Sequence, residues 1–231
     1  MIKKIKQPGK INNIVNIQSV RNKDNITLKN LDGYFQERFY YEDIYDNNKM
    51  KKFIKSVESQ IRTSNEYENY IGFLVNEVGL NHCAVLGNIE KDFASIEMHH
   101  YPFTLYDIVH LSISRQILLN KKFNSFTIIN DILQDHYNNI IGLTPLSKTV
   151  HELVHAGEIF VNLSQVYGNI NAFNNKYSMA MTDEMIEKFN QIVDYSEKNL
   201  AYSETDVLKK IYSVEQNKTK KEIQNNYMNE E

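Results

Sequence analysis

The 231-residue sequence contains one cysteine, no tryptophan, three prolines and eight glycines. The single cysteine, Cys83, excludes an internal disulfide framework and also a zinc site built from four cysteines of this chain. No apolar run approaches the roughly 18 residues that a membrane-spanning helix needs, so we expect no membrane segment. The opening MIKKIKQPGKINN lacks the apolar stretch of a secretory signal. These absences predict a cytoplasmic protein.

The charges are nearly balanced, with 26 Lys and Arg against 29 Asp and Glu and a formal net charge of −3. This balance excludes a nucleic-acid coat that binds by charge alone, although a local basic patch remains compatible with it. Asn, Lys, Ile and Tyr are abundant. That bias is typical of an AT-rich genome, such as that of a bacteriophage or a low-GC bacterium.

The hydrophobic pattern divides the chain into four segments and predicts an α+β fold. Residues 1–45 alternate as strands do and form an N-terminal β-rich segment. Residues 46–82 repeat apolar side chains at helical spacing. The repeat is interrupted at Thr63-Ser64-Asn65, where Ser64 can cap a second helix. Residues 83–165 mix short strands with helices. Residues 166–231 are helical and end in a polar tail.

The segment 83–165 has a definite predicted order of elements. A strand ends at Pro102, and Thr104 begins an amphipathic helix that carries Asp107 in its first turn. The expected elements in this segment are a strand over Ser95–His100, helices over Leu105–Leu119 and Phe126–Tyr137, an extended stretch over Gly142–Ser147, a short helix over Thr149–Ala156 and a strand over Ile159–Leu163.

Two pairs of histidines carry the chemistry of this segment: His99 with His100, and His151 with His155. Residues four apart on a helix lie on one face, so the imidazoles of His151 and His155 can chelate one metal ion. One interpretation of this H-E-x-x-H motif is a zinc peptidase with Glu152 as general base. A peptidase needs a third ligand, for which the candidates are Glu184 and Glu187.

The two pairs taken together suggest a different family. The sequence Glu97-Met-His99-His100 is followed by Pro145 and then by His151-x-x-x-His155-x-Gly. This pattern resembles that of the HNH, or ββα-metal, endonucleases, in the form found in many phage proteins. The resemblance covers about residues 83–161 and implies a ββα-metal core with a helical insertion.

The same resemblance extends to a degenerate zinc knuckle. Cys83-Ala-Val-Leu86-Gly stands where many HNH proteins carry a first C-x-x-C-G, and Ser147-x-x-Val150 stands where the second C-x-x-C lies. Only Cys83 of the four cysteines remains. We therefore expect no knuckle zinc.

The resemblance implies one divalent metal ion (Mg, Mn, Ni or Zn) bound by His99 and His151, with His155 as a third ligand or a phosphate contact. His100 would be the general base that takes a proton from water, and the metal would stabilise negative charge on the phosphate. The implied activity is hydrolysis of phosphodiester bonds in nucleic acid, DNA before RNA. Further candidate site residues are Glu97, His136, Lys148 and Glu152.

The sequence departs from the family pattern in the middle of the motif. Gly142 occupies the position of the family's asparagine, nine residues before His151, and Asn138 or Asn139 is the available substitute. The excursion over residues 101–141 is also long. These departures support a second hypothesis: a catalytically inactive phage protein that keeps the fold and binds a partner or a host component. The zinc peptidase is the third.

Overall fold

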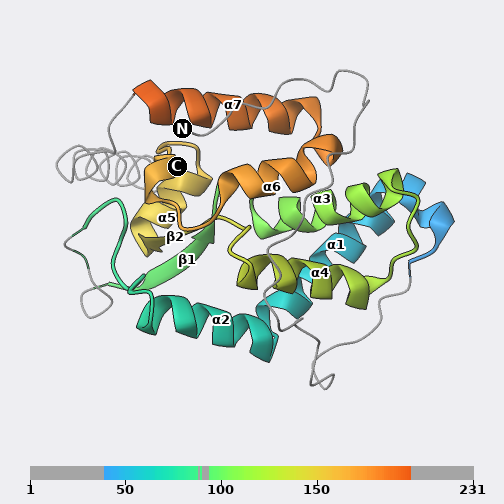
Figure 1. Cartoon of the computed structure of the whole chain (residues 1–231), viewed down its shortest axis with the longest axis horizontal. Coiled ribbons are helices and arrows are strands. Elements are labelled where there is room, and N and C mark those ends of the chain that lie inside the picture. The colour runs from blue at the N-terminus through green and yellow to red at the C-terminus, as the bar shows by residue number, and fades with distance from the viewer. Residues whose placement is uncertain (1–38, 88, 90–93, 199–231) are drawn as a thin grey trace, which may run out of the picture.

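The computed structural model describes residues 39–87, 89 and 94–198 (Figure 1). The strands predicted within residues 1–38 and the part of the helical segment beyond residue 198 lie outside the described residues. Where the predicted β-rich segment 1–45 enters the described part, the chain instead forms the 3-10 helix Tyr41–Tyr45. Over the described residues the fold is mixed α and β, as predicted, with one small sheet.

The first two helices are the predicted pair, α1 (Asn47–Arg62) and α2 (Asn65–Asn76). Ser64 separates them, and its hydroxyl accepts a hydrogen bond from the backbone N–H of Tyr67 at 3.1 Å, which caps α2. One apolar face of α1 is buried, including Phe53 and Val57. The opposite face carries exposed lysines, so α1 is amphipathic as its sequence predicts.

The sheet consists of β1 (Ile96–His100) and β2 (Leu143–Ser147), which pair antiparallel. His99 pairs with Thr144, and His100 pairs with Leu143. Because side chains alternate across a strand, Glu97 and His99 share one face, while Met98 and His100 share the other. The sequence alternation therefore decides which histidine meets which helix.

A different helix covers each face of this hairpin. On one face Met98 and Leu143 pack with Tyr70 and Leu74 of α2. On the other face lies α5 (Lys148–His155), which follows β2 directly. Figure 1 shows the strands between α2 and α5. β1, β2 and α5 together form a strand–strand–helix unit.

The excursion between the strands forms α3 (Leu105–Leu118) and α4 (Ser125–Tyr137), which pack against α1 beside the sheet. Thr104 and Asp107 make a capping box at the start of α3. Leu111 and Ile129 are fully buried in the core between these helices. The insertion thus belongs to the main hydrophobic core and is not a peripheral loop.

The C-terminal part of the described chain contains α6 (Ile170–Tyr177) and α7 (Asp183–Lys198), with short 3-10 helices over Leu163–Gln165 and Ser178–Ala180. The predicted strand over Ile159–Leu163 is wrong. Ile159 and Val161 are buried, but the segment pairs with no strand among the described residues and leads into the 3-10 helix. Within residues 39–87, 89 and 94–198, no helix is both long and apolar enough to cross a membrane.

Candidate metal site

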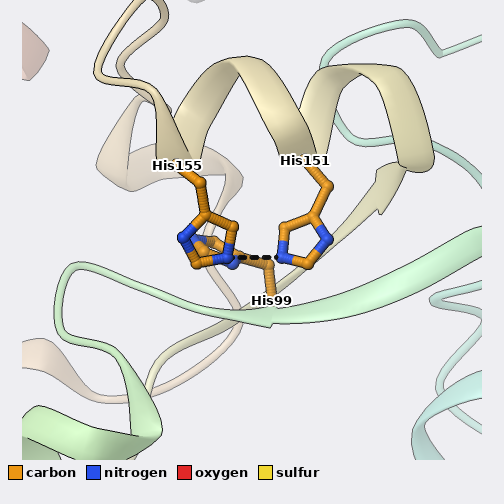
Figure 2. A group of neighbouring side chains, drawn as sticks. All are labelled: His99, His151 and His155. Atoms are coloured by element: carbon orange, nitrogen blue, oxygen red, sulfur yellow. Dashed lines mark hydrogen bonds between the residues drawn. The ribbon is translucent and has the colours of Figure 1, made fainter.

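Three imidazoles converge between the hairpin and α5. His99 comes from β1, and His151 and His155 come from successive turns of α5 (Figure 2). One ring nitrogen of each lies within 4.8 Å of those of the other two. The Nε2 atoms of His151 and His155 are 2.9 Å apart. Two histidine nitrogens bound to one zinc ion at about 2.05 Å stand roughly 3.3 Å apart, so this spacing is close to that of a shared ion.

The sequence of α5 explains how the helix presents these side chains. Val150 and Leu153 are the buried residues of α5. His151 and His155 lie on a different face of the helix, on the side of His99. The helix then ends abruptly, because Gly157 adopts a φ of +72° and the N–H of Glu158 donates to the carbonyl of Leu153 at 2.9 Å. This short, tightly bounded helix is sufficient to carry two histidines one turn apart.

Glu97 fixes the orientation of His151. The Nδ1–H of His151 donates to the Glu97 carboxylate. That bond leaves the Nε2 lone pair of His151 facing His99 and His155. A carboxylate on the second ring nitrogen is the usual support of a metal-binding histidine, since it fixes the tautomer and makes the imidazole a better ligand.

Burial favours the neutral imidazoles that a metal ion requires. His99 is 6% exposed, and its burial, followed by the charges of His151 and His155, lowers its pKa to about 3. Burial, followed by His151, also lowers the pKa of His155, which is more exposed. A neutral imidazole keeps a lone pair for a metal, whereas an imidazolium has none.

Two basic residues that the sequence motifs did not predict also influence this cluster. The positive charges of Arg62, at the end of α1, and Lys188, on α7, act on both His99 and His155. Both side chains are exposed. They lie outside the strand–strand–helix unit, 37 residues before His99 and 33 residues after His155, so only the fold brings them to it.

His100 faces the other side of the sheet. Its Nε2 is 3.0 Å from Nε2 of His136 on α4, and its ring stacks on Tyr67 of α2 at 6.0 Å between centroids. His136 donates from Nδ1 to the carbonyl of Ile132 at 2.8 Å, so its Nε2 accepts and His100 donates. Both histidines are buried, and burial lowers the pKa of His136 to about 4.

Gly142, which stands where the HNH pattern has an asparagine, lies close against the backbone of Tyr101. A Cβ on Gly142 would lie 2.2 Å from the carbonyl oxygen of Tyr101, so an asparagine cannot occupy it. Asn138 caps the end of α4, and Asn139, with a φ of +53°, turns the chain after it. The side chain of Asn139 accepts from the hydroxyl of Tyr70 at 3.3 Å, which places it beside α2 on the other face of the hairpin from α5.

The remaining candidates are distributed around the cluster. Lys148 is the exposed first residue of α5, and Glu152 is exposed on the same helix. Among the described residues, the third group beside His151 and His155 is His99, and neither Glu184 nor Glu187 joins them. The glutamate that the peptidase interpretation needs as a third ligand is therefore not beside these two histidines.

The four residues at which the sequence resembles a degenerate zinc knuckle are buried. Cys83, Leu86 and Val150 belong to the main hydrophobic core, and Ser147 is 4% exposed. The N–H of Ala84 donates to the carbonyl of Pro145 at 2.8 Å and ties this segment to β2. Cys83, Leu86 and Val150 are therefore part of the core packing in this structure.

Comparison with known proteins gives one result. A model of the Bacteriophage G278-like virion protein family matches residues 1–223, which include every element described above. It is not the HNH endonuclease family that the histidine spacing resembles. No curated protein and no solved structure matches the chain.

Proposed function

The chain belongs to the Bacteriophage G278-like virion protein family, and from this premise we propose that it is a phage protein with a divalent-metal site that hydrolyses phosphodiester bonds. The observation that carries the proposal is the convergence of His99, His151 and His155 on a strand–strand–helix unit. One histidine comes from the first sequence pair and two come from the second, and together they offer three ligand atoms for one metal ion.

The donor set fits a borderline-soft cation. Three imidazoles suit Zn²⁺, Ni²⁺ or Co²⁺, whereas Mg²⁺ prefers carboxylate, carbonyl and water oxygens. The support of His151 by Glu97 fits the same conclusion. We therefore propose Zn²⁺ or Ni²⁺ ahead of Mn²⁺ and Mg²⁺.

The protein's own residues suit a phosphate-bearing substrate. A divalent ion at this site would supply Lewis acidity toward a phosphate oxygen. Arg62 and Lys188 place positive charge near the cluster, which attracts the nucleic-acid backbone. Lys148 adds an exposed cation at the start of α5. We propose DNA as the first substrate to test and the host cytoplasm as the place of action.

One observation favours a second candidate function. His100, the general base implied by the resemblance, is 3% exposed and hydrogen-bonded to His136 on the other face of β1. A general base must reach the proton that it removes, directly or through one water. A virion protein that binds metal for assembly or host recognition, without hydrolysis, needs no such base.

The experiment separates metal binding from cleavage. The full chain is stripped with a chelator and titrated with Zn²⁺, Ni²⁺, Mn²⁺ and Mg²⁺, and each loaded form is tested for nicking of supercoiled plasmid and cleavage of RNA. His99→Ala and His151→Ala are expected to lose both binding and cleavage. The matched control is His82→Ala, which removes an exposed histidine outside the cluster.

Each outcome assigns one function. Binding with nicking that disappears in His99→Ala supports the nuclease. Binding without cleavage of DNA or RNA supports the non-catalytic virion protein. A full chain that binds none of the four metals refutes the proposed site. Cleavage that persists in both alanine variants would place the activity elsewhere.

A further inference from the structure

The three histidines of the cluster differ in how their second ring nitrogens are supported. A neutral imidazole has one lone pair and one N–H, so a ligand histidine must place its N–H on an acceptor. His151 places it on Glu97. His99 is 94% buried, yet neither of its ring nitrogens makes a hydrogen bond to any residue in the described part of the chain.

Thr144 carries a hydroxyl that lacks a hydrogen-bond partner among the described residues. It is the Cα partner of His99 across the hairpin, and paired residues of antiparallel strands point to the same face. Thr144 is fully buried, and its Oγ1 has no hydrogen-bond partner among the residues that the structure describes. Cβ atoms of such a pair are about 4.5–5.5 Å apart, within reach of a hydroxyl and an imidazole.

We infer that Thr144 is a positioning residue for His99, with its hydroxyl accepting the N–H of the ring when the other nitrogen binds a metal ion. A metal on one nitrogen confines the proton to the second one. Rotation of Thr144 between its staggered rotamers can bring Oγ1 to that proton. The inference rests on the proposed metal site. In it, Thr144 accepts the ring N–H of His99, as Glu97 accepts the ring N–H of His151.

The test measures Zn²⁺ affinity of the full chain by competition with a chromophoric chelator. Thr144→Val removes the acceptor at nearly constant shape and is expected to weaken binding about 10- to 100-fold. Thr144→Ser keeps the hydroxyl and is expected to restore the affinity to within a few-fold. The matched control is Ser147→Ala, which removes a buried, unpartnered hydroxyl from the opposite face of the same strand.

Folding is checked separately by thermal melting with chelator present. Thr144→Val is expected to melt no lower than the parent, because it removes a buried hydroxyl that has no partner. Loss of Zn²⁺ affinity in Thr144→Val with rescue by serine supports the inference. Equal affinity in Thr144→Val and the parent overturns it while leaving the metal site in place, and so does equal weakening in Ser147→Ala. No loss of affinity in His99→Ala overturns the metal site and the inference together.

Discussion

The buried pair His100–His136 predicts a loss of stability in mild acid. Burial holds the pKa of His136 at about 4, against a usual value of 6.5. The unfolded chain therefore binds a proton more readily than the folded chain, and stability falls as the pH drops through 6.5 toward 4. Over the interval from pH 7.5 to pH 5.0, this one group accounts for about 2 kcal/mol of the free energy of unfolding.

The assay is urea unfolding of the parent and of His136→Gln at both pH values, with chelator present to remove any metal. Glutamine retains an acceptor for the N–H of His100. We expect the loss between pH 7.5 and 5.0 to be smaller in the variant by about 2 kcal/mol. Comparing the two losses cancels any cost that is independent of pH. The exposed His82→Gln serves as control, and an equal loss in His136→Gln and the parent would refute the reasoning.

Three further perturbations test the site and its support. Glu97→Ala removes the carboxylate that orients His151 and should weaken Zn²⁺ binding about 10- to 100-fold in a competition titration; unchanged affinity would contradict this role. Gly142→Ala places a Cβ 2.2 Å from a backbone oxygen and should lower the free energy of unfolding by about 3 kcal/mol in urea; a cost near zero would show that the hairpin end can open. Lys176→Met leaves the carboxylate of Asp135, which Lys176 contacts at 2.5 Å, buried without its cation and should cost about 3–5 kcal/mol in the same assay. Adding Asp135→Asn should recover part of that cost, and no recovery would assign the loss to packing.

Local signals predicted most helices of the described chain well. The break between α1 and α2 is at Ser64, and the Thr104–Asp107 box begins α3, because a cap depends on a few neighbouring residues. The strand expected over Ile159–Leu163 did not form, because no strand among the described residues pairs with this segment. Partner availability depends on the whole fold.

The candidate site was predictable in part for the same reason. Helical spacing alone places His151 and His155 on one face, and the strand period alone separates His99 from His100. Spacing did not indicate that His100 would be buried against His136, because α4 lies in an insertion whose packing no motif encodes. The same holds for Lys188 on α7, whose positive charge acts on His99.

The sequence by itself determined the chemistry available: imidazoles in two pairs, one cysteine, and elements whose periods fix which side chains share a face. Tertiary structure decided which groups meet. The antiparallel register set Thr144 beside His99 and Glu97 toward α5, and the close approach at Gly142 excluded an asparagine there. Periodicity acts over a few residues, whereas register and packing depend on contacts between segments that are tens of residues apart.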